Sequence, residues 1–226
     1  MRRIRALIFD FDGLILDTEA PVFQSWQELY AAFGLRLELS EWSQYIGLAE
    51  GAFDFFAILQ ERLGRKLDAH LEKERSQREL QLILQQPVLP GVLEYLQTAR
   101  RLGLKVGLAS SSSCAWVTGH LQRLDLLSCF DCLRASDDVR SAKPDPELYQ
   151  AVLDAFGLGS HEALALEDSF NGVSAARRAG IFTVAVPNPL TEHMPLQAAN
   201  LRLRSLADLS LEALLAQAER DAVATD

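Results

Sequence analysis

Two aspartates, Asp10 and Asp12, directly follow a short apolar run near the start of the chain. The run Ala6–Phe9 is short enough to form one strand that is buried on both faces of a parallel sheet. Alternation along such a strand would put both carboxylates on one side of the backbone, at the carboxyl end where open α/β sheets bind their ligands. Gly13 then permits a sharp turn.

Carboxylates this close to each other repel. At ~4 Å and an effective dielectric of ~20 the repulsion is about 4 kcal/mol, which is large against the roughly 5–15 kcal/mol stability of a typical domain. A shared proton, a basic residue or a divalent cation would offset it. A single D-x-D pair more commonly caps a turn or faces solvent, but here the preceding apolar strand and further acids downstream favour a functional pair.

Further polar groups follow later apolar segments of the chain. Ser110 follows segment 105–109, Glu167 and Asp168 follow segment 163–166, and Lys143 lies in a loop. Taken singly, these residues have ordinary explanations as a helix cap, a solvated lysine and an acidic pair at a helix start. Together the acids suit Mg²⁺, while the hydroxyl and the ammonium suit a phosphoryl group. A carboxylate can also be the nucleophile in phosphoryl transfer, with a second one as general acid and base.

The elements that would position these groups follow two patterns. Residues 17–88 show helical spacing only, with segments 22–33, 53–63 and 67–86 and a further helix start near Ser40. From residue 92 onward helices and strands alternate. The expected helices are 92–102, 115–126, 146–156, 172–179 and 206–219, and the expected strands are 105–109, 132–135, 163–166, 182–186 and 201–203. This alternation predicts an α/β fold with a Rossmann-like, doubly wound parallel sheet. The helical block, residues 17–88, is then an inserted cap domain on a catalytic core made of residues 1–16 and 89–226.

The composition limits the partners that we expect. The 226 residues include 22 basic and 31 acidic ones, a formal charge of −9, which argues against nucleic acid and acidic membranes. No apolar run approaches the ~20 residues of a membrane span. Three cysteines suit a reducing compartment, so we expect a cytoplasmic protein. Cys129 and Cys132 have C-x-x-C spacing, but no second pair or helix start supports a redox or metal role.

Four motifs, in order, resemble those of the haloacid dehalogenase superfamily: 9-FDFDG-13, Ser110, 143-KPD-145 and 167-EDS-169. The chain is most similar to the phosphatase and β-phosphoglucomutase-like branch, which has an α-helical cap after the first strand. The resemblance covers nearly the whole chain. The name-giving dehalogenases lack the second aspartate, so Asp12 favours phosphate chemistry over halide displacement.

The resemblance implies a role for each matching residue. Asp10 would be the phosphorylated nucleophile, and Asp12 the general acid and base. Ser110 and Lys143 would hold the phosphoryl group. The implied magnesium ligands are Asp10, the backbone carbonyl of Asp12, Glu167 and Asp168. Further phosphate or substrate contacts are expected at Gly13, Glu19, Gly47 and Ser111.

These features predict a Mg²⁺-dependent phosphatase that hydrolyses a small sugar, polyol or nucleoside phosphate through an aspartyl-phosphate. β-Phosphoglucomutases carry a His near the position of Val22 and an Arg near that of Glu50, and this chain has neither. A sugar phosphomutase stays an alternative, as does a non-catalytic phospholigand-binding module, which the complete motif set disfavours. We expect a small phosphate ester as partner, no nucleic acid or membrane, and a monomer or weak dimer.

Overall fold

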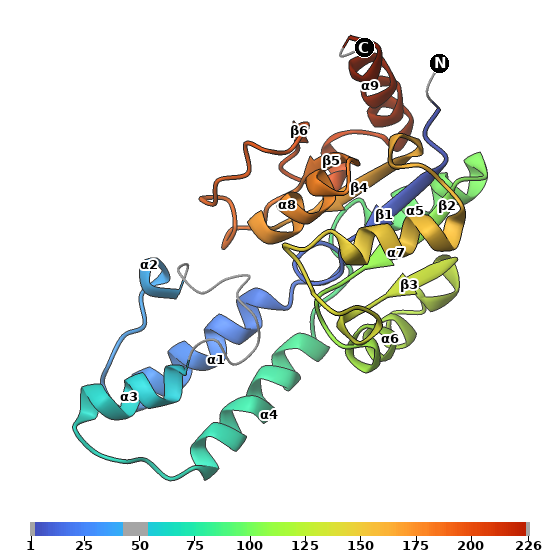
Figure 1. Cartoon of the computed structure of the whole chain (residues 1–226). Helices are drawn as coiled ribbons and strands as arrows, with labels where there is room; N and C mark the ends of the chain where they lie inside the picture. Colours follow the sequence, from blue (N-terminus) through green and yellow to red (C-terminus); the bar gives the residue numbers. More distant parts are fainter. Residues whose placement is uncertain (1–2, 43–53, 225–226) are drawn as a thin grey trace. The chain divides into compact units, whose positions relative to one another are not determined.

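The structure, a computed structural model, describes residues 3–42 and 54–224, and the chain divides into two compact units (Figure 1). One unit comprises Met1–Leu16 and Pro87–Asp226, and the other is Asp17–Gln86. The second boundary lies two residues before the expected one. Val88 pairs with Leu16, and the Leu89 amide donates to the Ile15 carbonyl at 2.9 Å, which ties this segment to the first unit.

The first unit is built on six parallel strands in the order β3-β2-β1-β4-β5-β6. The strands are β1 (Ala6–Phe9), β2 (Lys105–Ala109), β3 (Cys132–Arg134), β4 (Ala163–Glu167), β5 (Phe182–Ala185) and β6 (Leu201–Arg202). β1 lies between β2 and β4, and all four of its residues are buried. An apolar strand without alternation is what burial on both faces requires. The predicted parallel α/β fold is confirmed.

Helices cover both faces of this sheet (Figure 1). They are α5 (Val92–Leu102), α6 (Cys114–Arg123), α7 (Glu147–Phe156), α8 (Phe170–Arg178) and α9 (Leu211–Ala224). α7 and α8 share one apolar cluster with β1 and β4, to which Ile8, Val152, Ala165 and Ala176 contribute. α5 packs against β2 and α9. The core therefore lies on the faces of the sheet and leaves the strand ends free for polar residues.

The second unit consists, within its described part, of helices only. These are α1 (Glu19–Ala32), α2 (Leu39–Trp42), α3 (Phe55–Leu63) and α4 (His70–Leu84). Its core is aromatic: Trp42 stacks on Phe55 with ring centroids 4.8 Å apart, and the Tyr30 hydroxyl donates to the Phe55 carbonyl at 3.0 Å. The helical character expected for this block is thus present, and its function as a cap stays a prediction.

Two helices of the first unit begin at least two residues away from their predicted starts. The expected helix 206–219 is a 3-10 turn, Leu206–Asp208, followed by α9, because Leu209 is extended and Ser210 begins a new helix by accepting from the Ala213 amide at 3.3 Å. α8 begins two residues before the predicted start, because the Ser169 hydroxyl caps it by accepting from the Gly172 amide at 3.2 Å. Both differences arise from serine caps, which apolar periodicity does not reveal.

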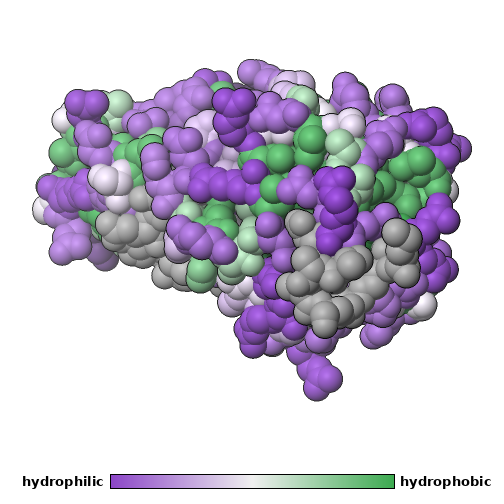
Figure 2. Space-filling view, turned by 90° about the horizontal axis from the view of Figure 1, so that it is seen from above, coloured by the Kyte–Doolittle hydropathy of each residue, from purple (hydrophilic) through white to green (hydrophobic). Residues whose placement is uncertain are grey.

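None of the described helices has both the length and the apolar character needed to cross a membrane. The face seen in Figure 2 is largely hydrophilic, with smaller apolar areas between the polar side chains.

Candidate active site

The first site segment is the turn that follows β1. The strand ends at Phe9, and the Asp10 amide still donates to the Leu166 carbonyl at 3.0 Å. The chain then turns at Phe11, whose carbonyl accepts from the Ile15 amide at 2.9 Å. Strand alternation therefore does not extend to Asp12, and the carboxylates of Asp10 and Asp12 have different partners.

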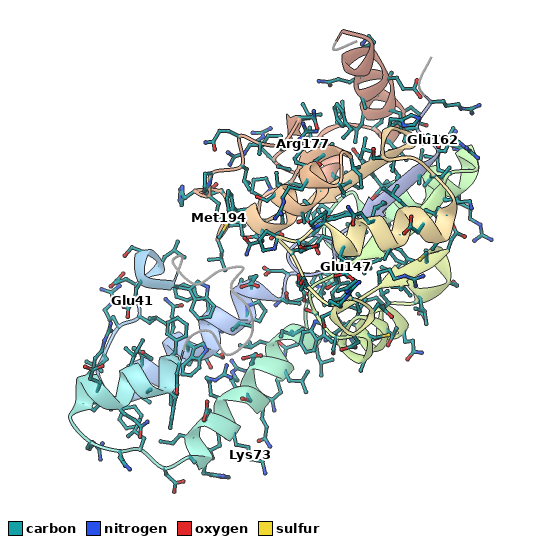
Figure 3. All side chains as sticks on the ribbon, viewed as in Figure 1. Glu41, Lys73, Glu147, Glu162, Arg177 and Met194 are labelled. Atoms are coloured by element: carbon teal, nitrogen blue, oxygen red, sulfur yellow. The ribbon has the colours of Figure 1, made fainter. Side chains whose placement is uncertain are left out.

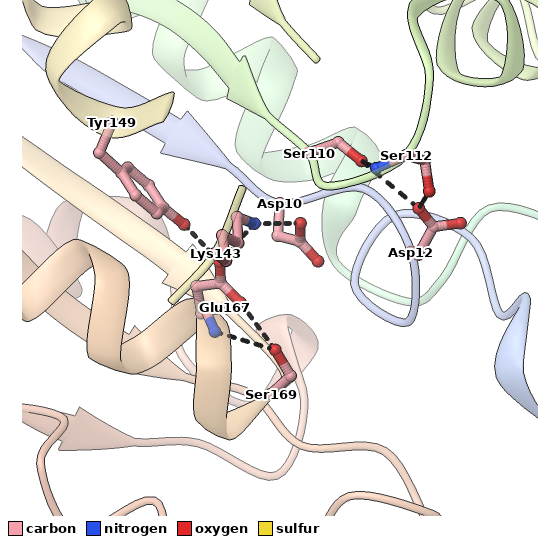
Figure 4. Close-up of polar contacts among 9 residues, drawn as sticks. Asp10, Asp12, Ser110, Ser112, Lys143, Tyr149, Glu167 and Ser169 are labelled. Carbon is pink, nitrogen blue, oxygen red and sulfur yellow. Dashed lines mark hydrogen bonds and ion pairs between the residues drawn. The ribbon is translucent and has the colours of Figure 1, made fainter. Parts of the chain in front are cut away.

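Lys143 lies between two buried acids (Figure 4). Its Nζ is 2.5 Å from Asp10 Oδ1 and 2.6 Å from Glu167 Oε1. Its side chain is only 4% exposed. Glu147, labelled in Figure 3, holds the loop that carries this lysine, because its Oε2 accepts from the amides of Arg140 and Ser141 at 3.1 Å each. The structure thus brings the Lys143 ammonium to two of the predicted acids.

Asp10, Glu167 and Asp168 form a buried acidic cluster. Each offers an oxygen within 4.8 Å of the others. Burial, the largest influence, raises the pKa of Asp10 to about 8; Lys143 opposes this shift and Glu167 adds to it. Burial alone would lower the pKa of Lys143, but Asp10 and Glu167 outweigh it and raise that pKa. One ammonium thus pairs with two of the three clustered carboxylates, an arrangement that a further cation would stabilise.

Two glycines make room for the acids. Gly13 has a φ of +80°, and a Cβ on it would lie 2.2 Å from Asp168 Oδ2. A Cβ on Gly172, in the first turns of α8, would lie 1.8 Å from Glu167 Oε2. A side chain at either position would displace the carboxylate beside it, so both positions favour glycine.

Asp12 lies beside the loop after β2, with its carboxylate bound by different residues. Ser112 Oγ donates to Oδ2 at 2.6 Å, and Ser110 Oγ lies 3.4 Å from the same oxygen (Figure 4). Trp116 Nε1 donates to Oδ1 at 3.0 Å. The structure thus brings Asp12 and Ser110 together, as expected for one site. The carboxylate of Asp12 is not part of the acidic cluster, and the predicted metal contact of its carbonyl stays a prediction.

Four contacts at the site escaped the sequence analysis. The Tyr149 hydroxyl donates to Glu167 Oε1, and Asn188 Nδ2 donates to Asp168 Oδ2 at 2.8 Å. Ser112 and Trp116 bind Asp12. Asn188 lies shortly after the end of β5, so the rule that located the other strand-end residues could have found it. Tyr149 and Trp116 lie inside amphipathic helices, where their apolar character gave no separate signal.

Three further contacts were predicted, at Ser111, Glu19 and Gly47. Ser111 is exposed next to Ser110. Glu19 is the first residue of α1 in the second unit. Gly47, like Glu50, lies outside the described residues. The proposed substrate contacts of these residues stay predictions.

Comparison with known proteins agrees with this geometry. The sequence model of the family described as haloacid dehalogenase-like hydrolase matches residues 7–186. The protein YhcW of Bacillus subtilis (strain 168), which carries a provisional phosphatase name, is 44% identical over 213 residues, covering 94% of this chain and 96% of that protein. Hexitol phosphatase B of Escherichia coli O157:H7 is 31% identical over 218 residues, covering 95% and 98%.

A solved structure extends the comparison to phosphomutases. The crystal structure of a candidate β-phosphoglucomutase from Thermotoga maritima superimposes with a TM-score of 0.78 and 29% identity, covering 93% of this chain and 98% of that one. The relatives thus comprise both phosphatases and mutases. The family match spans most of the chain, and the chain belongs to the haloacid dehalogenase-like hydrolases.

Proposed function

We propose that this enzyme is a Mg²⁺-dependent phosphatase that hydrolyses a small phosphomonoester of a sugar, polyol or nucleoside through an aspartyl-phosphate on Asp10. The observation that carries the proposal is the buried cluster of Asp10, Glu167 and Asp168, in which Lys143 pairs with the first two acids. A family of phosphatases and phosphomutases, with a hexitol phosphatase among the similar proteins, supports the substrate class.

The donor set fits magnesium. Hard cations take oxygen ligands, and burial of three carboxylates with one ammonium leaves a need for positive charge. Asp10, Glu167 and Asp168 would hold the ion, with the carbonyl of Asp12 as a further ligand. When bound, Mg²⁺ neutralises charge on the transferring phosphoryl oxygens.

The residues of the chain supply the remaining chemistry. A carboxylate oxygen of Asp10 attacks phosphorus, and the bond from phosphorus to the ester oxygen breaks. Lys143 and Ser110 hold the phosphoryl oxygens, and Asp12 gives a proton to the departing ester oxygen. In the second step a water oxygen attacks phosphorus, Asp12 takes a proton from that water, and Asp10 is released as a carboxylate. The products are an alcohol and inorganic phosphate.

Phosphate release decides whether the protein has this function. We expect it to release phosphate from hexitol and hexose phosphates and from p-nitrophenyl phosphate, and to stop when EDTA is added. Asp10→Asn should lower the rate by about 10³-fold or more, since it removes the nucleophile. Full activity of Asp10→Asn would exclude the proposed nucleophile. Binding of these esters without turnover by the unaltered protein would instead support a non-catalytic phospholigand-binding module.

A sugar phosphomutase is the second candidate, because similar structures include a β-phosphoglucomutase candidate. We favour hydrolysis because this chain has neither the His that mutases carry near the position of Val22 nor the Arg that they carry near that of Glu50. Incubation with β-glucose 1-phosphate distinguishes the two reactions. Hydrolysis yields glucose and phosphate, whereas glucose 6-phosphate as the main product would establish the mutase.

A further inference from the structure

Trp116 lies on α6 and contacts the carboxylate of Asp12 from a helix that carries no motif residue. Its indole Nε1 donates to Asp12 Oδ1 at 3.0 Å, while Ser112 Oγ donates to Oδ2 at 2.6 Å. The two oxygens of Asp12 therefore have different kinds of partner. Figure 4 shows the serine side of this arrangement, together with the contact of Asp10 with Lys143.

The difference between the partners matters for a proton. An indole N–H can only donate, so the oxygen that it binds must remain an acceptor. A serine hydroxyl can donate to a carboxylate oxygen and can rotate to accept from the same oxygen when that oxygen is protonated. A proton on Oδ2 of Asp12 is therefore compatible with Ser112, which can accept it. A proton on Oδ1 is incompatible with Trp116, which can only donate to that oxygen.

The Trp116 indole packs against a buried side chain, and the start of its helix is capped. His120, which is 6% exposed, packs edge-on against it with ring centroids 4.4 Å apart and an interplanar angle of 69°. Ser113 caps α6 by accepting from the Trp116 amide at 3.3 Å. The Cys114 amide donates to Asp137 Oδ2 at 2.7 Å and ties the start of the helix to the loop after β3. A donor fixed in this way can fix the carboxyl group that it binds.

We propose that Trp116 is a positioning residue that holds the Asp12 carboxyl group so that Oδ2, beside Ser112, carries the proton exchanged with the reacting oxygens. This inference rests on the proposed phosphatase function. In the first step the Oδ2–H bond breaks as the ester oxygen, leaving phosphorus, takes the proton. In the second step the water oxygen bonds to phosphorus as the bond from phosphorus to Asp10 breaks, and Oδ2 takes a proton from that water, which restores the acid.

The inference predicts a specific dependence on the leaving group. An alkoxide leaving from a sugar phosphate needs a proton, whereas p-nitrophenolate leaves well without one. Trp116→Phe keeps an aromatic ring beside His120 and removes the indole donor together with part of the ring surface. We expect kcat/KM to fall about tenfold for a hexose phosphate and less than about twofold for p-nitrophenyl phosphate, because kcat/KM reports the first transfer step. An equal fall for both substrates, or no fall for either, would overturn the inference.

Trp42→Phe is the matched control. Trp42 lies in the aromatic core of the second unit, and its buried indole N–H has no hydrogen-bond acceptor among the described residues. This variant should change kcat/KM for the two substrates by the same factor. A leaving-group dependence as strong as that of Trp116→Phe would show that loss of any buried tryptophan has this effect and would overturn the inference.

Indole resonances test the contact without turnover. In a ¹H–¹⁵N spectrum the Trp116 indole signal, assigned by its absence from Trp116→Phe, should shift in Asp12→Asn, while the other indole signals stay in place. An unmoved Trp116 signal would overturn the inference even if the protein is a phosphatase. Failure of the proposed function is recognised separately, because the unaltered protein would then release no phosphate or Asp10→Asn would remain active.

Discussion

Glu167 is a buried carboxylate whose stability depends on each of its hydrogen-bond donors. It is 0% exposed, and it accepts from Lys143, from the hydroxyl of Tyr149 and, at 3.5 Å, from Ser169 Oγ. Burial, followed by the charges of Glu167 and Asp10, raises the pKa of Tyr149 well above its ordinary value, so this phenol remains a donor. The tyrosine therefore stabilises a charge that the site needs for its proposed cation.

Tyr149→Phe should destabilise the metal-free protein by about 1–3 kcal/mol, because a buried charged acceptor loses a partner. Urea unfolding in EDTA measures this loss. Tyr95→Phe is the matched control: the Tyr95 hydroxyl is also buried but donates to a neutral acceptor, the Leu209 carbonyl, at 2.9 Å. Its loss should be smaller, about 0.5–1.5 kcal/mol. Equal losses for the two variants would mean that the charge on Glu167 adds nothing to the Tyr149 bond.

The extent to which the sequence predicts the site depends on where each residue lies. Asp10 and Ser110 follow apolar strands and Glu167 ends one. The common edge of a parallel sheet brings such residues together whatever their separation in the chain. Tyr149 and Trp116 reach the site from helices. An amphipathic pattern shows which face of a helix is buried. It does not show that the hydroxyl of a tyrosine or the N–H of a tryptophan on that helix will bind a distant carboxylate.

At the scale of the element, the helix ends that were predicted most accurately from the sequence are those followed by a glycine. α5 and α7 end where expected because Gly103 and Gly157 adopt left-handed conformations, with φ of 68° and 64°. The predicted helix 115–126 instead ends at Arg123, because Asp125 adopts a left-handed conformation (φ 56°) while the apolar pattern continues past it. A non-glycine residue in this conformation carries little sequence signal, so such an end is hard to predict.

α8 gives a prediction about glycine inside a helix. Replacing a helical glycine by alanine ordinarily stabilises a protein by about 0.5–1 kcal/mol. Gly172→Ala should instead destabilise by about 1–3 kcal/mol, because its Cβ would overlap the Glu167 carboxylate. It should also weaken Mg²⁺ binding, because the displaced carboxylate belongs to the acidic cluster.

Gly119→Ala, in α6, is the control for this prediction. Apart from its chain neighbours and the backbone of its own helix, no atom of the described structure lies within 4 Å of a Cβ built there, so this variant should show the ordinary stabilisation. Urea unfolding of both variants measures the difference. A stabilising Gly172→Ala would mean that Glu167 can move away at little cost, and that its close contact with α8 does not define the site.

At the scale of the whole molecule, the acidic cluster adds to a chain that already has a formal charge of −9. Net charge of one sign destabilises a compact state through self-repulsion. A cation bound among three buried carboxylates would relieve both the local and the overall excess. Stability should therefore depend jointly on pH and on Mg²⁺.

The direction of this dependence follows from Asp10, whose pKa is raised from 3.8 to about 8 in the folded protein. Between these values the metal-free folded state keeps a proton that the unfolded chain has lost. The contribution of Asp10 to stability is therefore full below pH 3.8 and is lost as the pH rises through about 8. Mg²⁺ requires the ionised carboxylate and displaces this proton, so its affinity should rise up to about tenfold per pH unit within the same window.

Thermal unfolding with and without Mg²⁺ therefore provides the test. At one fixed Mg²⁺ concentration the increase in Tm should be clearly larger at about pH 8 than at about pH 6, since stabilisation grows with [L]/Kd. KCl at equal ionic strength is the control for screening of the overall charge. Asp10→Asn, which has no proton to lose, should show a Mg²⁺ effect that varies much less with pH. An increase in Tm that is the same at both pH values in the unaltered protein would mean that Asp10 is already ionised without metal, and that Lys143 alone balances its charge.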